Sequence, residues 1–472
     1  MTRTKKRAAF IIFLIALIII VGAFLIILSI NMFRDKDEDI PVTGYELKIP
    51  TLLQDLNPDP LVTDYELNAM EGQSEFIEGK KTDTYGYNGN YLGPVLKLRT
   101  GEEVNIKVSN SLSDTTTIHW HGLVVDGEDD GGPHQGILPG ETWTPNFIVD
   151  QPAATLWFHP HLMGNTADQV YQGLSGLIYV EDELSDSLMI PKDYGIDDIP
   201  LIVQDRNFKA DGSFDYSVSM MGTVPGNTIL VNGTPSPYFN VMDGKVRFRI
   251  LNASNSENFV FTLSDGGEFN QIASDGGFLS APFQRKSLFL APAERAEVIV
   301  DFSSSNGTVF LMAGKTEILE LRLADVLRDS GEIPQALAKI EEIPLGNSPR
   351  ERTFILQNMG ITGTINGTYF DVDRIDEEVQ QNETEVWTII NQGGMMQSSG
   401  HPFHVHGTQF QVISRNGEKP TSEESGFKDT VFVDNGEEVR IKVRFSHVGI
   451  YMYHCHILEH EDNGMMGQFS VE

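Results

Sequence analysis

The segment IYMYHCH, residues 450–456, identifies the repeating unit of this chain, because related segments occur twice before it. They are TLWFHPH at 155–161 and TVFLMAG at 308–314. A second segment precedes each copy and contains an asparagine that recurs about every 140 residues: GEEVNIKVSNSL at 101–112, GKVRFRILNAS at 244–254 and ETEVWTIINQG at 383–393. Two segments that recur in the same order indicate three copies of one structural unit.

Each unit is expected to be a β-sandwich. The chain contains 44 glycines and 22 prolines, and short runs of β-branched and aromatic residues lie between these turn-forming residues. Units of about 140 residues with this pattern are typical of two packed sheets. We predict an all-β chain with three tandem domains, at residues 45–185, 195–328 and 350–472. The connections fall near 183–200 and 330–352, and we expect the second to be a partly helical linker.

The first 34 residues have a composition of their own. Four basic residues within positions 3–7 precede 21 apolar or small residues, Ala8 to Leu28. A helix of that length spans about 31 Å, which is enough to cross a bilayer, and the run is longer than the apolar stretch of a cleaved signal peptide. We predict that residues 1–34 form a cytoplasmic basic tip and a single-pass signal anchor in the cell membrane, with the three domains outside the cytoplasm.

Charge and cysteine content limit the partners of the chain. The formal net charge is −33 at pH 7, which argues against nucleic acid and anionic membrane surfaces as partners and attracts cations. The only cysteine is Cys455, so no internal disulfide can form. A lone thiol outside the cytoplasm persists more readily when a metal ion masks it.

The histidines are concentrated at equivalent positions of the first and third units. Ten of the 12 histidines belong to four motifs, which are HWHG from residue 119, HPH from 159, HPFHVHG from 401 and HCHILEH from 454. In the middle unit, Met312, Ala313 and Gly314 stand at the position of HPH and HCH. The segment NFVFTLSDG, which contains no histidine, stands at the position of HWHG and HPFHVHG. We therefore expect metal ligands in the outer units and a metal-free, structural middle unit.

The spacing of the motifs predicts two metal sites. Residues i and i+2 of a strand point to the same side, so each His-x-His pair offers two imidazoles on one face. Four such pairs can meet only where the outer units pack together, which indicates a multinuclear site between domains. Cys455 faces the other side of its strand, where it can join His401, His460 and Met465. Two imidazoles, a thiolate and a thioether are the blue-copper ligand set, whereas structural zinc favours more thiolates.

These motifs, HWHG, WFHPH, HPFHVHG and HCHILEHEDNGM, resemble the four copper motifs of the multicopper oxidases, from about residue 45 to 472. The resemblance implies three cupredoxin-like Greek-key domains, four copper ions and the reduction of dioxygen to water at a trinuclear cluster. It implies that a type 1 copper is bound by His401, Cys455, His460 and Met465, and a type 2 copper by His119 and His404. The implied ligands of a type 3 pair are His121, His159, His161, His406, His454 and His456.

Acidic residues near the motifs have expected roles of their own. Reduction of dioxygen consumes protons, and Glu461 and Asp130 match the proton-relay carboxylates of the family. Asp429, in FKDTV, is expected to orient a turn or an imidazole. The remaining two histidines, His134 and His447, lie outside the motifs and are expected on loops or strand edges.

The electron donor is the least determined feature. HPFHVHGTQFQVISRNG and HCHILEHEDNGMMGQF resemble the bacterial copper-efflux oxidases and the bacterial laccases. The efflux oxidases carry Asp and Met where this chain has Gln397 and Ser399, and their methionine-rich covering segment is absent. We therefore expect an open type 1 edge and a laccase-like oxidase that acts on phenols.

Other functions stay open at this point. Cuprous or ferrous ion is the alternative donor, with Met359, Met395 and Met396 as soft ligands if they do not fill a core. A non-catalytic copper-binding surface protein is a further alternative, although scaffold members of the family lose their ligands. A copper nitrite reductase needs only three histidines for its second copper, so the four His-x-His pairs exclude it. We expect a monomer that uses dioxygen and a small reducing substrate.

Overall fold

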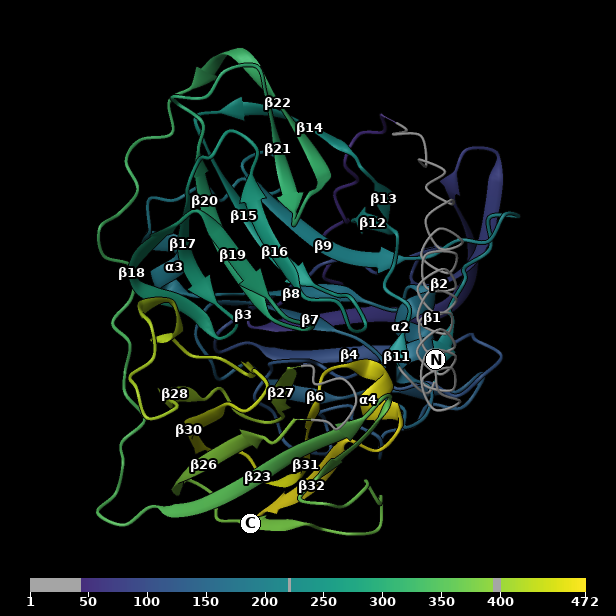
Figure 1. Ribbon diagram of the computed structural model, residues 1–472, viewed down its shortest axis with the longest axis vertical. Helices are drawn as coiled ribbons and strands as arrows, with labels where there is room; N and C mark the ends of the chain where they lie inside the picture. The colour runs from purple at the N-terminus through teal and green to yellow at the C-terminus, as the bar shows by residue number, and fades with distance from the viewer. Residues whose placement is uncertain (1–43, 220–221, 394–399) are drawn as a thin grey trace, which may run out of the picture. The chain divides into compact units, whose positions relative to one another are not determined.

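The computed structural model describes residues 44–219, 222–393 and 400–472 (Figure 1). The anchor predicted within residues 1–34 lies outside the described residues, and so do Met395, Met396, Gln397 and Ser399. Over the described ranges, no helix is long and apolar enough to cross a membrane.

The first domain consists of two sheets around one apolar core. One sheet has the order β2-β1-β4-β5, with β6 beside β4, and the other has the order β3-β8-β7. Apolar side chains of both sheets form a single cluster, which includes Val104, Ile106 and Leu156. The elements are β1 (Val62–Ile77), β2 (Lys80–Tyr87), β3 (Leu96–Arg99), β4 (Glu103–Asn110), β5 (Thr142–Trp143), β6 (Asn146–Ile148), β7 (Ala154–Phe158), α2 (Thr166–Gln172), β8 (Gly176–Glu181) and α3 (Glu183–Ser187).

The middle domain has larger sheets, of order β13-β12-β9-β15-β20-β17-β18 and β14-β22-β21-β16-β19. Every residue of β9 and β15 is buried. Leu201 and Ile250 belong to the core of the middle domain, while Ile202 and Leu251 cluster with Trp157 and Leu177 of the first domain. The elements are β9 (Asp198–Arg206), β10 (Val218–Ser219), β11 (Gly222–Thr223), β12 (Thr228–Val231), β13 (Thr234–Pro235), β14 (Tyr238–Asp243), β15 (Lys245–Asn252), β16 (Phe259–Leu263), β17 (Phe269–Ser274), β18 (Gly277–Arg285), β19 (Ser287–Leu290), β20 (Arg295–Asp301), β21 (Thr308–Ala313) and β22 (Thr316–Arg328).

The third domain pairs the sheets β24-β23-β26-β30-β28 and β25-β32-β31-β27-β29. Its core includes Cys455 and Met465. The elements are β23 (Arg350–Met359), β24 (Thr362–Ile365), β25 (Glu377–Val379), β26 (Thr384–Asn391), β27 (His401–Val405), β28 (Gln411–Arg415), η1 (Ser422–Glu424), β29 (Thr430–Val433), β30 (Glu438–Arg444), β31 (Gly449–Cys455), α4 (Leu458–Asp462) and β32 (Met466–Val471).

The strand pairing confirms that the recurring segments are equivalent. The asparagine segments form β4, β15 and β26, and each pairs in parallel with the first strand of its domain, β1, β9 and β23. The segments that include HPH and HCH form β7 and β31, and their middle counterpart is β21. Each pairs antiparallel with the next strand, which pairs in parallel with an edge strand. The same order of connections therefore occurs three times.

The expectation of a partly helical linker is wrong. Residues 329–349, between β22 and β23, contain neither helix nor strand. The amides of Leu337 and Ala338 donate instead to carbonyl oxygens of Ser280 and Leu279 in β18, and the side chain of Leu337 is buried. Contact with the middle domain satisfies backbone groups that a helix would have satisfied internally.

The His-x-His pairs lie at strand ends rather than within strands. His404 and His454 are in β27 and β31, and His119 and His159 form an isolated bridge with each other. The second histidine of each pair follows the end of its strand or bridge. The rings of each pair still lie close together, with centroids 4.9 to 6.0 Å apart.

Candidate metal centre

All twelve side chains that the sequence analysis assigned to metal binding are buried. Eleven of them are at most 1% exposed, and His460 is 5% exposed. They lie in the first and third domains, so the site is formed where these two domains meet. The first domain contributes histidines from HWHG and HPH, and the third domain contributes histidines from HPFHVHG and HCHILEH.

Three histidines form the first group. Nε2 of His454 lies 3.1 Å from Nε2 of His161 and 3.2 Å from Nε2 of His406. The Nδ1 atom of each ring has another neighbour: Asp130 for His406, Glu461 for His161 and the backbone oxygen of Cys455 for His454. The ring nitrogens of a first-domain motif and of two third-domain motifs therefore converge on one point, as ligands of a metal ion do.

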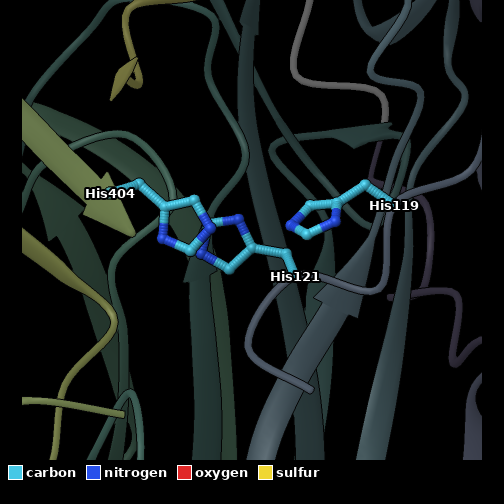
Figure 2. A group of neighbouring side chains, drawn as sticks. All are labelled: His119, His121 and His404. Atoms are coloured by element: carbon cyan, nitrogen blue, oxygen red, sulfur yellow. The ribbon is translucent and has the colours of Figure 1, made fainter. Parts of the chain in front are cut away.

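A second group consists of His121, His159 and His456, and a third consists of His119, His121 and His404. Within each group the candidate ligand atoms lie within 4.8 Å of one another. Figure 2 shows the third group, in which His404 approaches from the third domain and His119 from the first. The rings of His121 and His404 stack, with centroids 3.7 Å apart.

Hydrogen bonds on the outer side of these rings determine which nitrogen faces inward. Nδ1 of His119 and of His404 bonds to the backbone oxygen of Asp130 and of Asp429, at 3.0 and 2.8 Å. Nδ1 of His159 bonds to the oxygen of Pro160, and Nε2 of His121 bonds to Asp429. Within these two groups, the buried nitrogens without a hydrogen-bond partner are Nε2 of His119, His159 and His404, Nδ1 of His121 and both nitrogens of His456.

These free nitrogens are the observation that tests whether the residues fit metal ions. A buried nitrogen without a partner is costly, by about 1–3 kcal/mol each, and metal coordination removes that penalty. Burial lowers the pKa of seven of these imidazoles, to about 3 for His161 and His454, so these rings are neutral as ligands must be; the other five are His121, His159, His404, His406 and His456. Nitrogen donors without an acidic oxygen among them suit copper better than calcium or magnesium.

A separate group surrounds Cys455. Its sulfur lies 3.3 Å from Nδ1 of His401 and 3.6 Å from Nδ1 of His460. Burial lowers the pKa of His401 to about 3 and of His460 to about 4, and it raises the pKa of the Cys455 thiol. The amide of Cys455 donates to the oxygen of Met465 at 3.1 Å. A Cβ at Gly363 would collide with the thioether sulfur of Met465, so this glycine makes room for it.

Both acids that the sequence analysis singled out contact the cluster. Oδ2 of Asp130 lies 2.7 Å from Nδ1 of His406 and 3.4 Å from Nδ1 of His119. The two carboxylate oxygens of Glu461 lie 3.4 Å from Nδ1 of His161 and 3.1 Å from Nδ1 of His454. Burial raises the pKa of Glu461, which favours a carboxyl group that can carry a proton.

Asp429 orients an imidazole, as one of the two predicted roles requires. Its Oδ1 lies 3.0 Å from Nε2 of His121, and both side chains are fully buried. The carboxylate also pairs with Arg295, a residue of the middle domain that the sequence analysis did not single out. The signal that could have found Arg295 is its position, since it comes directly before a strand segment, AEVIV, in which four of five residues are apolar.

The type 1 edge differs from the sequence expectation. His460 is only 5% exposed, and its ring donates to the backbone oxygen of Gly360, in the turn between β23 and β24. Among the described residues, this group therefore offers no broad open edge. Met359, at the start of the same turn, is 62% exposed and does not fill a core.

The two remaining histidines are on loops, as expected. Nε2 of His134 lies 2.8 Å from Oε1 of Gln468, and Nδ1 of His447 lies 3.2 Å from Oδ1 of Asp126. Neither residue belongs to a histidine group of the metal centre.

Comparisons with known proteins agree with this geometry. Family models described as multicopper oxidase match residues 68–185, 198–330 and 334–472. The multicopper oxidase mco of Staphylococcus epidermidis is 42% identical over 90% of this chain and 92% of its own. The cell division protein FtsP of Escherichia coli is 36% identical over the same shares. A crystal structure of laccase from Pediococcus acidilactici has a TM-score of 0.88 and 37% identity, and covers 91% of this chain and 94% of its own.

The chain belongs to the multicopper oxidase family. The cofactor of this family is a set of four copper ions, one of type 1, one of type 2 and two of type 3. Family membership implies a copper-dependent oxidoreductase with dioxygen as the electron acceptor.

Proposed function

We propose that this chain is a laccase-like oxidase that takes single electrons from phenol-type donors and passes them to dioxygen. The observation that carries the proposal is the shared strand β31. Cys455 lies beside His401 and His460, while its neighbours His454 and His456 belong to the two interdomain histidine groups. One tripeptide therefore connects the electron-accepting group with the dioxygen-reducing cluster through covalent bonds.

The assignment of ligands is the one that the resemblance to the family implies, and the grouping of the side chains supports it. His401, Cys455, His460 and Met465 would hold the type 1 copper, and His119 and His404 the type 2 copper. The type 3 pair would be held by two triads, His121 with His159 and His456, and His161 with His406 and His454. The chemistry that the four ions supply in this family is single-electron removal from a donor and four-electron reduction of dioxygen to water.

Glu461 and Asp130 are proposed to supply the protons that this reaction consumes. Asp130 hydrogen-bonds with Nδ1 of His406, and the carboxylate oxygens of Glu461 lie 3.4 Å from Nδ1 of His161 and 3.1 Å from Nδ1 of His454. Both acids are therefore close to the ligand rings. Both are buried, at 1% and 2% exposed, which keeps bulk water from competing for the transferred proton.

A metal-ion donor is the alternative that one observation favours. Met359 is exposed beside the turn that covers His460, so its thioether is available to a soft cation such as cuprous ion. The acidic surface of the chain would attract such a cation. A phenol would have to donate its electron at the rim of this turn, because the ring of His460 is only 5% exposed.

The test compares oxygen uptake by the copper-loaded protein with a dimethoxyphenol, Cu(I), Fe(II) and Mn(II) as donors. The laccase proposal expects phenol turnover without added copper. Phenol turnover that requires excess copper contradicts it and favours the metal-ion alternative.

A non-catalytic role is the alternative that the similarity to a cell division protein suggests. All four predicted copper motifs retain their ligand residues here, and this favours catalysis. A copper-loaded sample that is blue but takes up no oxygen with any of these donors would favour the non-catalytic role.

The location of the protein is a proposal of its own. We infer from the apolar run Ala8 to Leu28 that the chain is held in the cell membrane by a single-pass anchor, with its copper domains outside the cytoplasm. Cell fractionation tests this. The full chain is expected in the membrane fraction, and a chain from residue 44 onwards is expected to leave that fraction.

A further inference from the structure

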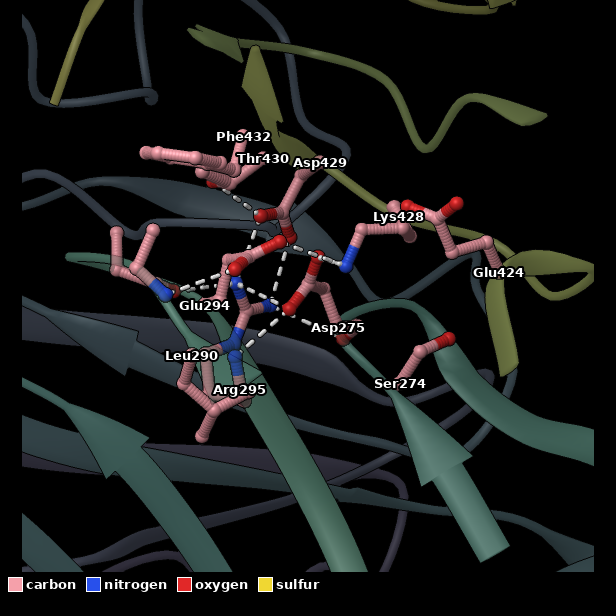
Figure 3. Close-up of polar contacts among 12 residues, drawn as sticks. Ser274, Asp275, Leu290, Glu294, Arg295, Glu424, Lys428, Asp429, Thr430 and Phe432 are labelled. Atoms are coloured by element: carbon pink, nitrogen blue, oxygen red, sulfur yellow. Dashed lines mark hydrogen bonds and ion pairs between the residues drawn. The ribbon is translucent and has the colours of Figure 1, made fainter. Parts of the chain in front are cut away.

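A buried ion pair joins the middle domain to the third domain next to the trinuclear cluster (Figure 3). Nη1 and Nη2 of Arg295, the first residue of β20, each lie 2.6 Å from one carboxylate oxygen of Asp429. Both side chains are fully buried. A two-point pair of this kind fixes the orientation of a carboxylate as well as its position.

Asp429 passes this orientation on to His121. Oδ1 of Asp429 lies 3.0 Å from Nε2 of His121, and Oγ1 of Thr430 lies 3.2 Å from the same nitrogen. A carboxylate only accepts hydrogen bonds, so Nε2 of His121 carries the proton. Nδ1 of a neutral ring then keeps its lone pair. Nδ1 is the nitrogen of His121 that has no hydrogen-bond partner, and His121 belongs to the group that contains His159 and His456.

The guanidinium of Arg295 is itself held from two further directions. Its Nε donates to the backbone oxygen of Thr155 in β7, the strand that leads to His159, at 3.0 Å. Its Nη2 donates to the backbone oxygen of Asp275 at 3.0 Å, and Oδ1 of Asp275 accepts from the Arg295 amide at 2.7 Å. Arg295 thus contacts all three domains. Figure 3 shows its head group between Asp275 and Asp429.

The glycine that follows His121 is adapted to this pair. A Cβ at Gly122 would lie 2.6 Å from Oδ2 of Asp429 and 3.0 Å from Nη2 of Arg295. The φ angle of Gly122 is +94°, a conformation that favours glycine. The HWHG motif therefore ends in the one residue type that lets the histidine pair approach the ion pair this closely.

We propose that Arg295 is a positioning residue for the trinuclear centre. It holds the Asp429 carboxylate against Nε2 of His121, so that His121 presents Nδ1 to the cluster. The inference rests on the proposed role of His121 as a type 3 ligand. It gives the middle domain, which contributes no histidine to the cluster, a part in the geometry of the copper site.

The test replaces Arg295 with Met and compares it with a matched control, Arg249→Met. Arg249 is also a buried arginine of the middle domain; it pairs with Asp198 and donates to Oγ1 of Thr155 at 3.0 Å. Among the described residues Arg249 bonds to no histidine. Copper content, the blue absorption of type 1 copper and the near-ultraviolet band of the type 3 pair are measured for both variants and for the wild type.

Arg295→Met is expected to keep the blue absorption and to lose the type 3 band. Loss of a residue that orients a metal ligand lowers metal affinity by roughly 10–100-fold. The folded fraction of the Arg249→Met variant is expected to keep both bands. Arg295→Met with a full complement of copper and an unchanged type 3 band overturns the proposal, as does equal loss of both bands in the two variants. A wild-type protein without a type 3 band would instead contradict the assignment of His121.

A double variant separates positioning from charge balance. R295M alone leaves the buried Asp429 carboxylate uncompensated, whereas R295M/D429L removes both charges and also the acceptor for His121. The thermal midpoint is expected to recover in the double variant, while the type 3 band stays weak. Recovery of both the thermal midpoint and the type 3 band would show that the Arg295–Asp429 ion pair serves stability alone. If R295M does not fold, R295K supplies the comparison, since lysine keeps the charge but cannot hold both carboxylate oxygens.

Discussion

Oδ2 of Asp130 lies 2.7 Å from Nδ1 of His406, although 276 residues separate the two in the chain. The contact joins the first domain to the third, and it leaves Nε2 of His406 facing the other cluster histidines. Replacement by Asn keeps an oxygen that accepts from Nδ1 but cannot take up a proton. Asp130→Asn is therefore expected to bind copper fully and to reduce dioxygen more slowly, by about 10²-fold or more. Oxygen uptake at wild-type rate in a fully loaded variant would exclude Asp130 from proton transfer.

Glu461 is expected to behave in the same way, and the chain offers a close control. Glu459 is a buried carboxylate two residues earlier that accepts from Tyr216 and Asn255 instead of contacting the cluster. Glu461→Gln is expected to slow oxygen uptake by about 10²-fold or more, while Glu459→Gln changes it little. Rapid-reaction measurements should show that the donor still reduces the blue copper in Glu461→Gln. An equal effect of both substitutions would indicate a structural role.

Cys455→Ser is expected to abolish the blue absorption and all donor oxidation, because the thiolate is the characteristic ligand of type 1 copper. His454 and His456 are unchanged, so the type 2 and type 3 signals should persist. Serine is close to cysteine in size, and the thermal midpoint of the copper-free protein should change little. The spectrum and the copper content check the first two expectations. Loss of all copper would contradict the separation of the two sites.

Gly122→Ala is expected to lower the free energy of unfolding by more than the strain of alanine at a positive φ angle alone. Alanine at a positive φ costs roughly 1–2 kcal/mol, and the collision with Asp429 and Arg295 adds about 1–3 kcal/mol. Gly140 is the matched control, because its φ is +81° and a Cβ there would meet nothing within 4 Å. Denaturant unfolding of both variants measures the difference. An equal loss of unfolding free energy in the two variants would mean that the Arg295–Asp429 ion pair can move aside.

Met359→Leu distinguishes the two donor classes. It removes a thioether with little change in volume, so phenol oxidation should be unaffected. If cuprous ion is a donor, its oxidation should become several-fold slower at low concentration. Met242→Leu is the control, since Met242 is 49% exposed in the middle domain. Equal Cu(I) oxidation by both variants would remove Met359 from the metal-ion alternative.

Much of this molecule could be predicted from local pattern. The recurring asparagine and aromatic segments indicated three equivalent units, and the strands β4, β15 and β26 have the same neighbours in all three. The convergence of the histidine pairs was predictable because the motifs occupy equivalent places in the outer units. Their position at strand ends was not, and neither was the cover over His460, since both depend on turns whose course tertiary contacts decide.

The sequence alone indicated the repeat, the residues proposed for the metal centre and the chemical class of the ligands, because each is a matter of residue type and short spacing. Only the tertiary structure decided which nitrogen of each imidazole faces the cluster and that Arg295 of the middle domain reaches it. The reason is physical: a tautomer is set by the hydrogen bond on the far side of the ring, and for His121 that partner lies 308 residues away. Local periodicity carries no information about such a contact.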